Sequence, residues 1–106
     1  FAFPNNPAYI AFKGGLAQLT KSLAYDLGKF NIRCNGIAPG YIKTNMTKKS
    51  YLSPKRNKLI ASKTILEKWG YSNDLVGAVI FLISNASTYV TAQNIFVDGG
   101  WSSKGL

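Results

Sequence analysis

Asn31-Ile32-Arg33-Cys34-Asn35-Gly36-Ile37-Ala38-Pro39-Gly40 is the stretch that decides the fold of this 106-residue chain. The run as far as Ala38 is short and leans apolar, and Pro39-Gly40 closes it, which is typical of a buried strand followed by a sharp turn. A second run of this kind covers residues 94–98 and is closed by Gly99-Gly100. The sequence therefore predicts two strands, over 31–38 and 94–98.

Helical patterns accompany both strands. From Ala8 to about Phe30, leucines recur every three or four residues and form one apolar stripe, which predicts an amphipathic helix that ends near Gly28. Its stripe consists of Leu16, Leu19, Leu23 and Leu27. A second helix is predicted from Leu75 to about Ser84, after N-cap candidates at 72–74. It is apolar nearly all round, which indicates burial on more than one side.

The segment from Tyr41 to Gly70 is polar, basic and irregular. Ser53-Pro54 predicts the start of a helix that runs to about Ser62. Because simple links between strands and helices are much shorter, we expect this insertion to form a lid or a binding loop. The order of the chain is therefore helix, strand, lid, helix, strand.

A strand–helix–strand order predicts an α/β protein with parallel strands and a right-handed crossover. Two strands are too few for a stable parallel sheet, both of whose faces must be covered. We expect the other strands to come from an upstream part or from other chains. The start at Phe1, without methionine or a signal-peptide pattern, leads us to expect one part of a longer, cytoplasmic protein.

Composition excludes several classes of protein. The apolar fraction of 46% is that of a globular protein, and no apolar run approaches the roughly 18 residues of a membrane span. The chain has no histidine, which excludes a histidine-based triad and a His-ligated zinc site, and we predict no metal site. Cys34 is the one cysteine, so an internal disulfide is impossible and a reducing compartment fits.

The net charge is +9, and seven basic residues fall between Lys43 and Lys63. Such a block suits an anionic partner, either nucleic acid or an acidic substrate. A solvated lysine-rich surface is the favoured interpretation, because the block carries no aromatic-interleaved or glycine-rich nucleic-acid motif. Nucleic acid is therefore not an expected partner.

Tyr9 and Lys13 carry the most specific chemistry in the chain. Their i, i+4 spacing places both on one face of a helix, where a cation lowers the pKa of a phenol toward neutrality. A tyrosine of this kind can act as a general acid or base. Taken alone, the pair could equally be an ordinary amphipathic pair. The turn 39–44, at the carboxyl end of the first strand, lies where α/β sheets bind ligands.

These features occur together in a fixed order along the chain: Tyr9-x-x-x-Lys13-Gly14-Gly15, then 35–40, then Thr44, then Val97-Asp98-Gly99-Gly100. In this combination the chain resembles the C-terminal part of a short-chain dehydrogenase/reductase, over essentially its whole length. The segment 41–47 and the ending 98–101 most resemble bacterial sugar-acid members, the gluconate 5-dehydrogenases and 2-deoxygluconate 3-dehydrogenases. One departure is Ala92, where the family often has glycine.

The resemblance implies a fold: residues 1–106 would be the C-terminal fragment of a single Rossmann-like domain with a doubly wound parallel sheet, and 45–68 the substrate lid. The N-terminal nucleotide-binding half would be absent. Its glycine-rich loop, carbonyl-polarising serine and relay asparagine would lie upstream of residue 1. We therefore expect the fragment alone to be inactive.

The resemblance also implies an activity for the parent protein. It would be an NAD- or NADP-dependent oxidoreductase, a homotetramer, that interconverts a secondary alcohol and a ketone, on a small molecule such as the sugar acid gluconate. Tyr9 would exchange the proton with the substrate oxygen, and Lys13 would hold the nicotinamide ribose. Together with Tyr9 and Lys13, the cofactor site would be formed by Pro39, Gly40, Ile42 and Thr44.

Two alternatives remain open at this point. A 3-oxoacyl-[acyl-carrier-protein] reductase would suit the basic block, since its carrier is acidic. A non-catalytic interaction module would suit the apolar helix after Leu75 and the last strand. Thr44 could also serve only in a turn or a helix cap.

Overall fold

The computed structural model describes residues 7–104, and of Tyr9 it describes the backbone but not the side chain. The helices of this part are α1 (Pro7–Gly28), α2 (Lys48–Tyr51), α3 (Pro54–Ser62) and α4 (Val76–Ile83). The strands are β1 (Gly36–Pro39), β2 (Ile42–Lys43), β3 (Gly70–Tyr71) and β4 (Asn94–Val97). Short 3₁₀ turns are η1 (Ser72–Leu75), η2 (Asn85–Ser87) and η3 (Trp101–Ser103).

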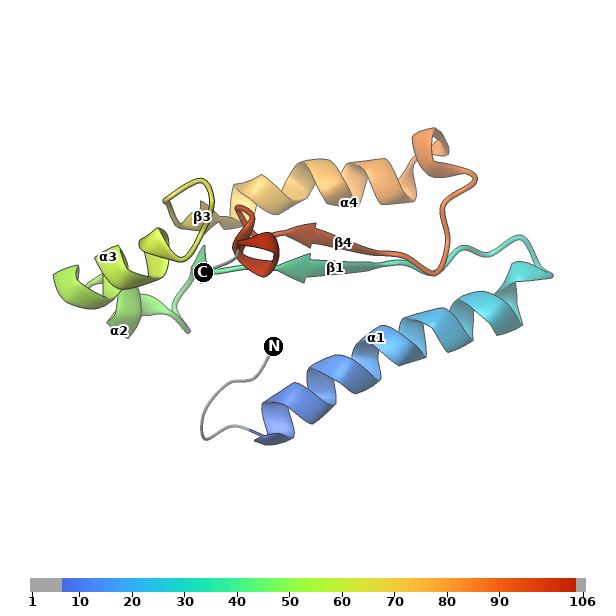
Figure 1. Cartoon of the computed structure of the whole chain (residues 1–106). Coiled ribbons are helices and arrows are strands. Elements are labelled where there is room, and N and C mark those ends of the chain that lie inside the picture. Colours follow the sequence, from blue (N-terminus) through green and yellow to red (C-terminus); the bar gives the residue numbers. More distant parts are fainter. Residues whose placement is uncertain (1–6, 105–106) are drawn as a thin grey trace.

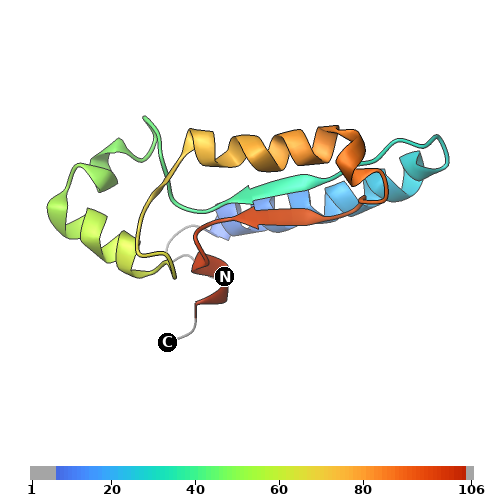
Figure 2. The same cartoon turned by 90° about the horizontal axis from the view of Figure 1, so that it is seen from above.

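Strands β1 and β4 pair in parallel, with Gly36 opposite Asn94 and Pro39 opposite Val97. Helices α1 and α4 lie on opposite sides of this pair (Figures 1 and 2). Helices α2 and α3 lie beyond the carboxyl ends of the two strands (Figure 1). The predicted α/β class and the parallel pairing are confirmed.

The first strand is shorter than predicted, because it begins at Gly36 instead of Asn31. Asn31 has φ 60°, a left-handed backbone that a strand does not allow. The guanidinium of Arg33 donates to the carbonyls of Leu82, Ser84 and Val90 and to the hydroxyl of Ser87. Residues 31–35 are thus a connection whose arginine binds the C-terminal end of α4.

Ala92 explains how the chain enters the last strand. It has φ 60°, in the region that favours glycine, and its N–H donates to the carbonyl of Cys34 at 2.8 Å. This is the position at which the resembled family often has glycine. The backbone here needs the conformation that glycine would supply without strain.

The apolar stripe predicted for the first helix is not its buried face. Thr20 and Ala24 are buried on α1, whereas Leu16 is 52% exposed, and Leu19 and Leu23 are exposed as well. The predicted burial of the second clear helix is also wrong for this chain, since α4 has no buried residue and Ile83 is 77% exposed. Two strands offer too little surface to cover both helices.

The best-buried aromatic side chain, Trp69, lies at the base of the predicted lid. Trp69 is 3% exposed, and its indole N–H donates to the carbonyl of Asn57 at 3.2 Å. Tyr41 and Tyr51 meet its ring edge to face, with centroids 5.8 and 6.1 Å away. This aromatic cluster joins the turn after β1 to α2 and to the start of β3.

Within the lid, the helix predicted from Ser53-Pro54 is confirmed as α3. The Ser53 hydroxyl accepts from the N–H of Arg56 at 3.5 Å, and Pro54 occupies the first turn. Helix α2 and strands β2 and β3 were not predicted. Each is only two to four residues long, too short to give a periodic pattern.

Candidate functional site

A cleft of about 530 Å³ lies between α1 and the β1–β4 pair. Its size is within the range of small-molecule and cofactor sites. Helix α1 contributes Ile10, Lys13, Gly14, Leu16, Ala17 and Thr20. The rest of the lining is Asn35–Pro39, Asn94, Phe96, Asp98 and Trp101. The cleft therefore reaches the carboxyl ends of both strands, where α/β sheets bind ligands.

Two of the predicted site residues line this cleft together. Lys13 comes from the first turns of α1 and Pro39 from the end of β1. Tyr9 lies one helical turn before Lys13 on α1, and its side chain is outside the described residues. Their predicted roles toward a cofactor stay predictions.

Gly40, the next predicted residue, permits a close approach of two turns. A Cβ at this position would lie 2.6 Å from the Cα of Asp98, closer than real Cβ contacts allow. The N–H of Gly40 also donates to the carbonyl of Val97 at 3.0 Å. Glycine here lets the turn after β1 lie directly against the turn after β4.

Ile42 and Thr44 lie further along the same turn and do not line the cleft. Ile42 is buried in β2, and its carbonyl accepts from the Thr47 hydroxyl at 2.7 Å. The N–H of Thr44 donates to the same hydroxyl at 3.0 Å. Thr44 thus belongs to a turn built around Thr47, a residue that the sequence interpretation missed although its T-x-x-T spacing is visible.

Asp98 is a second residue that sequence reasoning did not assign to the site. It lines the cleft, and its two carboxylate oxygens accept from the N–H groups of Gly100 and Ser102, each at 2.9 Å. Desolvation raises the pKa of this carboxyl, but hydrogen bonds from Ser102 and Gly100 outweigh it and hold the pKa below its usual value. Asp98 therefore shapes the turn after β4 in its charged form.

Replacing Asp98 with Asn should lower the free energy of unfolding by about 1 kcal/mol or less at neutral pH. Because the folded-state pKa lies below the reference value of 3.8, the charged form stabilises the fold above that pH. This contribution is lost as the pH falls below about 4 and through the folded-state pKa. Urea unfolding between pH 7 and 3 should show a deficit that shrinks on acidification; a deficit independent of pH would contradict the assignment.

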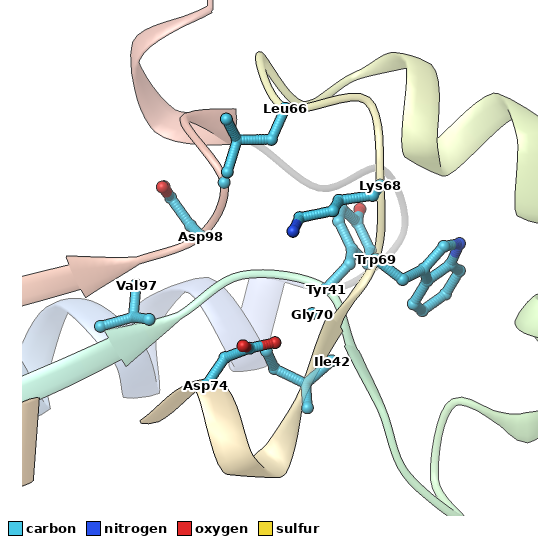
Figure 3. A pocket seen from close by; sticks show the side chains of 10 residues that line it. Tyr41, Ile42, Leu66, Lys68, Trp69, Gly70, Asp74, Val97 and Asp98 are labelled. Atoms are coloured by element: carbon cyan, nitrogen blue, oxygen red, sulfur yellow. The ribbon is translucent and has the colours of Figure 1, made fainter. Parts of the chain in front are cut away.

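A smaller pocket of about 160 Å³ lies at the base of the lid (Figure 3). Its lining includes Tyr41, Trp69 and Asp98, and the amino group of Lys68 points into it. The carboxylate of Asp74, on the same pocket, accepts from the N–H of Tyr71 at 2.7 Å. The pocket is smaller than typical ligand cavities, which leaves the larger cleft as the candidate site.

Between residues 7 and 104, no group of three or more acidic, histidine or cysteine side chains is arranged to hold a metal ion. No helix in that range is both long and apolar enough to cross a bilayer.

The family model described as Enoyl-(Acyl carrier protein) reductase matches residues 1–102. The chain belongs to the short-chain dehydrogenase/reductase family, as its motifs predicted. A relative from Escherichia coli (strain K12), 2-dehydro-3-deoxy-D-gluconate 5-dehydrogenase, is 40% identical over 92% of this chain. That match covers 39% of the relative, so the chain spans about two fifths of its length.

Solved structures agree with the fold. A 4-hydroxyisoleucine dehydrogenase complexed with NADH has a TM-score of 0.95 and 37% identity, over 99% of this chain and 43% of its own. A gluconate 5-dehydrogenase from Burkholderia cenocepacia J2315, in complex with NADP and tartrate, has a TM-score of 0.94 and 36% identity, over 99% and 41%. These neighbours have the Rossmann-like fold, and the present chain corresponds to less than half of it.

Proposed function

We propose that this chain is the C-terminal part of an NAD- or NADP-dependent oxidoreductase that interconverts a secondary alcohol and a ketone on a sugar acid such as gluconate. The observation that carries the proposal is the cleft at the carboxyl ends of β1 and β4, which Lys13 and Pro39 line together. The sugar-acid relatives and the nucleotide-bound neighbours support the substrate class and the cofactor.

The residues of the cleft fit the nicotinamide end of such a cofactor. Lys13 supplies a cation that can donate to ribose hydroxyls, and Ile37, Ala38 and Pro39 supply an apolar wall for a flat ring. Because Gly40 lies in close contact with Asp98, the turn after β1 lies directly against the turn after β4 at the end of that wall. When bound, the nicotinamide accepts or returns the hydride.

The chain's own part in the proposed reaction is to bind, orient and move a proton. Tyr9 would take the proton from the alcohol oxygen during oxidation and return it to the ketone oxygen during reduction. Lys13, one turn later on α1, would hold the ribose and favour the phenolate of Tyr9. Segment 45–68 would close over the substrate.

The test uses the full-length protein that carries this chain. With NAD or NADP, we expect formation of the reduced nicotinamide on gluconate or 2-dehydro-3-deoxygluconate, and little on glucitol, which lacks the carboxylate. Turnover of glucitol and gluconate at equal rates would contradict the sugar-acid assignment. Absence of both cofactor binding and turnover would contradict the oxidoreductase proposal.

The basic face of the lid favours one second candidate, a 3-oxoacyl-[acyl-carrier-protein] reductase. Lys55, Arg56 and Lys58 are all exposed on α3, and the chain has no acidic residue between Asp26 and Glu67. An acidic carrier would bind such a face in a salt-dependent way. Salt-sensitive activity on a carrier-bound 3-oxoacyl group, without activity on gluconate, would favour this candidate over the first.

We further propose that the parent protein is cytoplasmic and forms a homotetramer. Apolar side chains recur at helical spacing on the exposed surfaces of α1 and α4. They are Phe12, Leu16, Leu19 and Leu23 on α1, and Val76, Val79, Ile80 and Ile83 on α4. Apolar areas of this kind mark contacts with other parts or subunits. Light scattering of the full-length protein measures its oligomeric state. A monomer would contradict the proposed homotetramer.

A further inference from the structure

The segment between β2 and β3, which we call the lid (45–68), is attached to the rest of the molecule mainly through its two ends. Helices α2 and α3 lie beside each other beyond the carboxyl ends of β1 and β4, away from α1 and α4 (Figure 1). The position of the lid relative to the cleft is therefore controlled by the contacts that hold those two ends.

The outgoing end of the lid is held by local contacts. The Thr47 hydroxyl donates to the carbonyl of Ile42 at 2.7 Å. The ammonium of Lys43 lies over the rings of Tyr51 and Tyr71, 5.7 and 5.2 Å from their centroids. These contacts join the start of the lid to the strands β2 and β3 at its base. All the residues that make them lie within the lid or next to it in sequence.

The returning end is held differently, by the turn after β4. The N–H of Leu66 donates to the carbonyl of Gly99 at 3.0 Å. Thr64 is only 2% exposed, and a Cβ at Gly99 would lie 3.5 Å from its Cβ. The returning end of the lid is therefore packed against the C-terminal part of the chain.

Lys104 completes this contact from beyond η3. Its ammonium donates to the carbonyl of Ser62 at 2.6 Å and to that of Thr64 at 3.1 Å. Ser62 is the last residue of α3, so its carbonyl has no partner within the helix. A cation at this position satisfies that carbonyl and is favoured by the helix dipole.

We infer that Lys104 is a positioning residue, which holds the C-terminal end of α3 and thereby fixes how the lid lies relative to the cleft. Lys104 lies outside the motifs of the family and beyond the residues 1–102 that match the family model. The part of the inference that concerns substrate rests on the proposed function. The part that concerns the lid rests only on the contacts of Lys104 and can be tested without any activity.

The test compares three variants of the full-length protein. Lys104→Met removes the ammonium and keeps the length of the side chain, whereas Lys104→Arg keeps a donor and should restore the contact. Lys63→Met is the matched control, because it removes an exposed cation at the same helix end. In Lys104→Met we expect amide hydrogen exchange at residues 59–66 to be about five-fold faster, with no change in β1 and β4.

Kinetics add the second readout. In Lys104→Met we expect KM for the substrate to rise about five-fold, while kcat and the dissociation constant of the nicotinamide cofactor stay within about two-fold. Unchanged exchange in Lys104→Met, or equally fast exchange in Lys63→Met, would overturn the inference. Faster exchange with an unchanged KM would overturn the positioning role. If the wild type lacks oxidoreductase activity, the proposed function fails, while the exchange result still decides whether Lys104 holds the lid.

Discussion

Tyr9→Phe in the full-length protein should reduce kcat by about 10³-fold and leave the dissociation constant of the nicotinamide cofactor nearly unchanged. The substitution removes only the phenolic oxygen, which the proposed reaction needs to exchange a proton with the substrate oxygen. Phenylalanine keeps an aromatic ring at residue 9, whose backbone belongs to the first turn of α1. Stopped-flow turnover and cofactor titration of the two proteins measure both quantities.

Tyr25→Phe is the matched control, because it removes a phenolic oxygen from the same helix at an exposed position. It should leave both kcat and cofactor affinity at the wild-type level. Loss of cofactor binding in Tyr9→Phe would mean that Tyr9 serves the cofactor and not the proton transfer. Wild-type turnover in this variant would remove Tyr9 from the reaction altogether.

Trp69→Ala should lower the free energy of unfolding of the full-length protein by about 3–5 kcal/mol. The side chain is 3% exposed, and its removal would leave a cavity beside Tyr41 and Tyr51. The substitution also leaves the carbonyl of Asn57 without the indole N–H that it accepts from. Denaturant unfolding, followed by far-UV circular dichroism, measures the loss.

Two further variants separate packing from hydrogen bonding. Trp69→Phe keeps a ring in the aromatic cluster and loses the indole N–H, so it should cost less than Trp69→Ala. Tyr89→Ala removes a fully exposed aromatic ring and should change stability by less than about 0.5 kcal/mol. A small loss in Trp69→Ala, comparable with that of Tyr89→Ala, would mean that the lid base contributes little to the stability of the fold.

Much of the secondary structure could be predicted from the sequence, because the relevant signals are local. The leucine spacing and Gly28 gave the first helix and its end, and Ser53-Pro54 gave the start of α3. The first strand was predicted too long, since the apolar run does not reveal that Arg33 turns aside to bind the end of α4. A contact between residues about 50 positions apart leaves no local signal.

The faces of the two long helices were predicted less well. Hydrophobic periodicity identifies which side of a helix is apolar, but not whether this chain supplies a surface to cover it. On α1 the buried positions are Thr20 and Ala24, and the Thr20 hydroxyl oxygen would lie 3.7 Å from a Cβ at Gly36, where the helix approaches β1. Among the described residues, Leu16, Leu19 and Leu23 of the stripe and most of the apolar surface of α4 remain exposed.

In the candidate site too, some residues could be predicted from the sequence and others only the structure revealed. The sequence placed Lys13 and Pro39 in one site through family motifs, and the structure has both on one cleft. Asp98 appeared in the sequence only as part of a glycine-rich ending, although its carboxylate organises the turn after β4. No sequence pattern indicated a role for Lys104, because its ammonium donates to two backbone carbonyls some 40 residues away.

The sequence by itself determined the family, the order of helix, strand, lid, helix and strand, and the chemical types available to the site. These properties depend on local periodicity and on motifs of fixed spacing, which a single chain displays directly. Only the tertiary structure decided which turns touch, as at Gly40 and Asp98, and what holds the lid, as at Trp69 and Lys104. Those contacts join residues that are not neighbours in sequence, so no local pattern reveals them, and the contact of Gly40 with Asp98 exists only once the backbone has brought the carboxyl ends of β1 and β4 together.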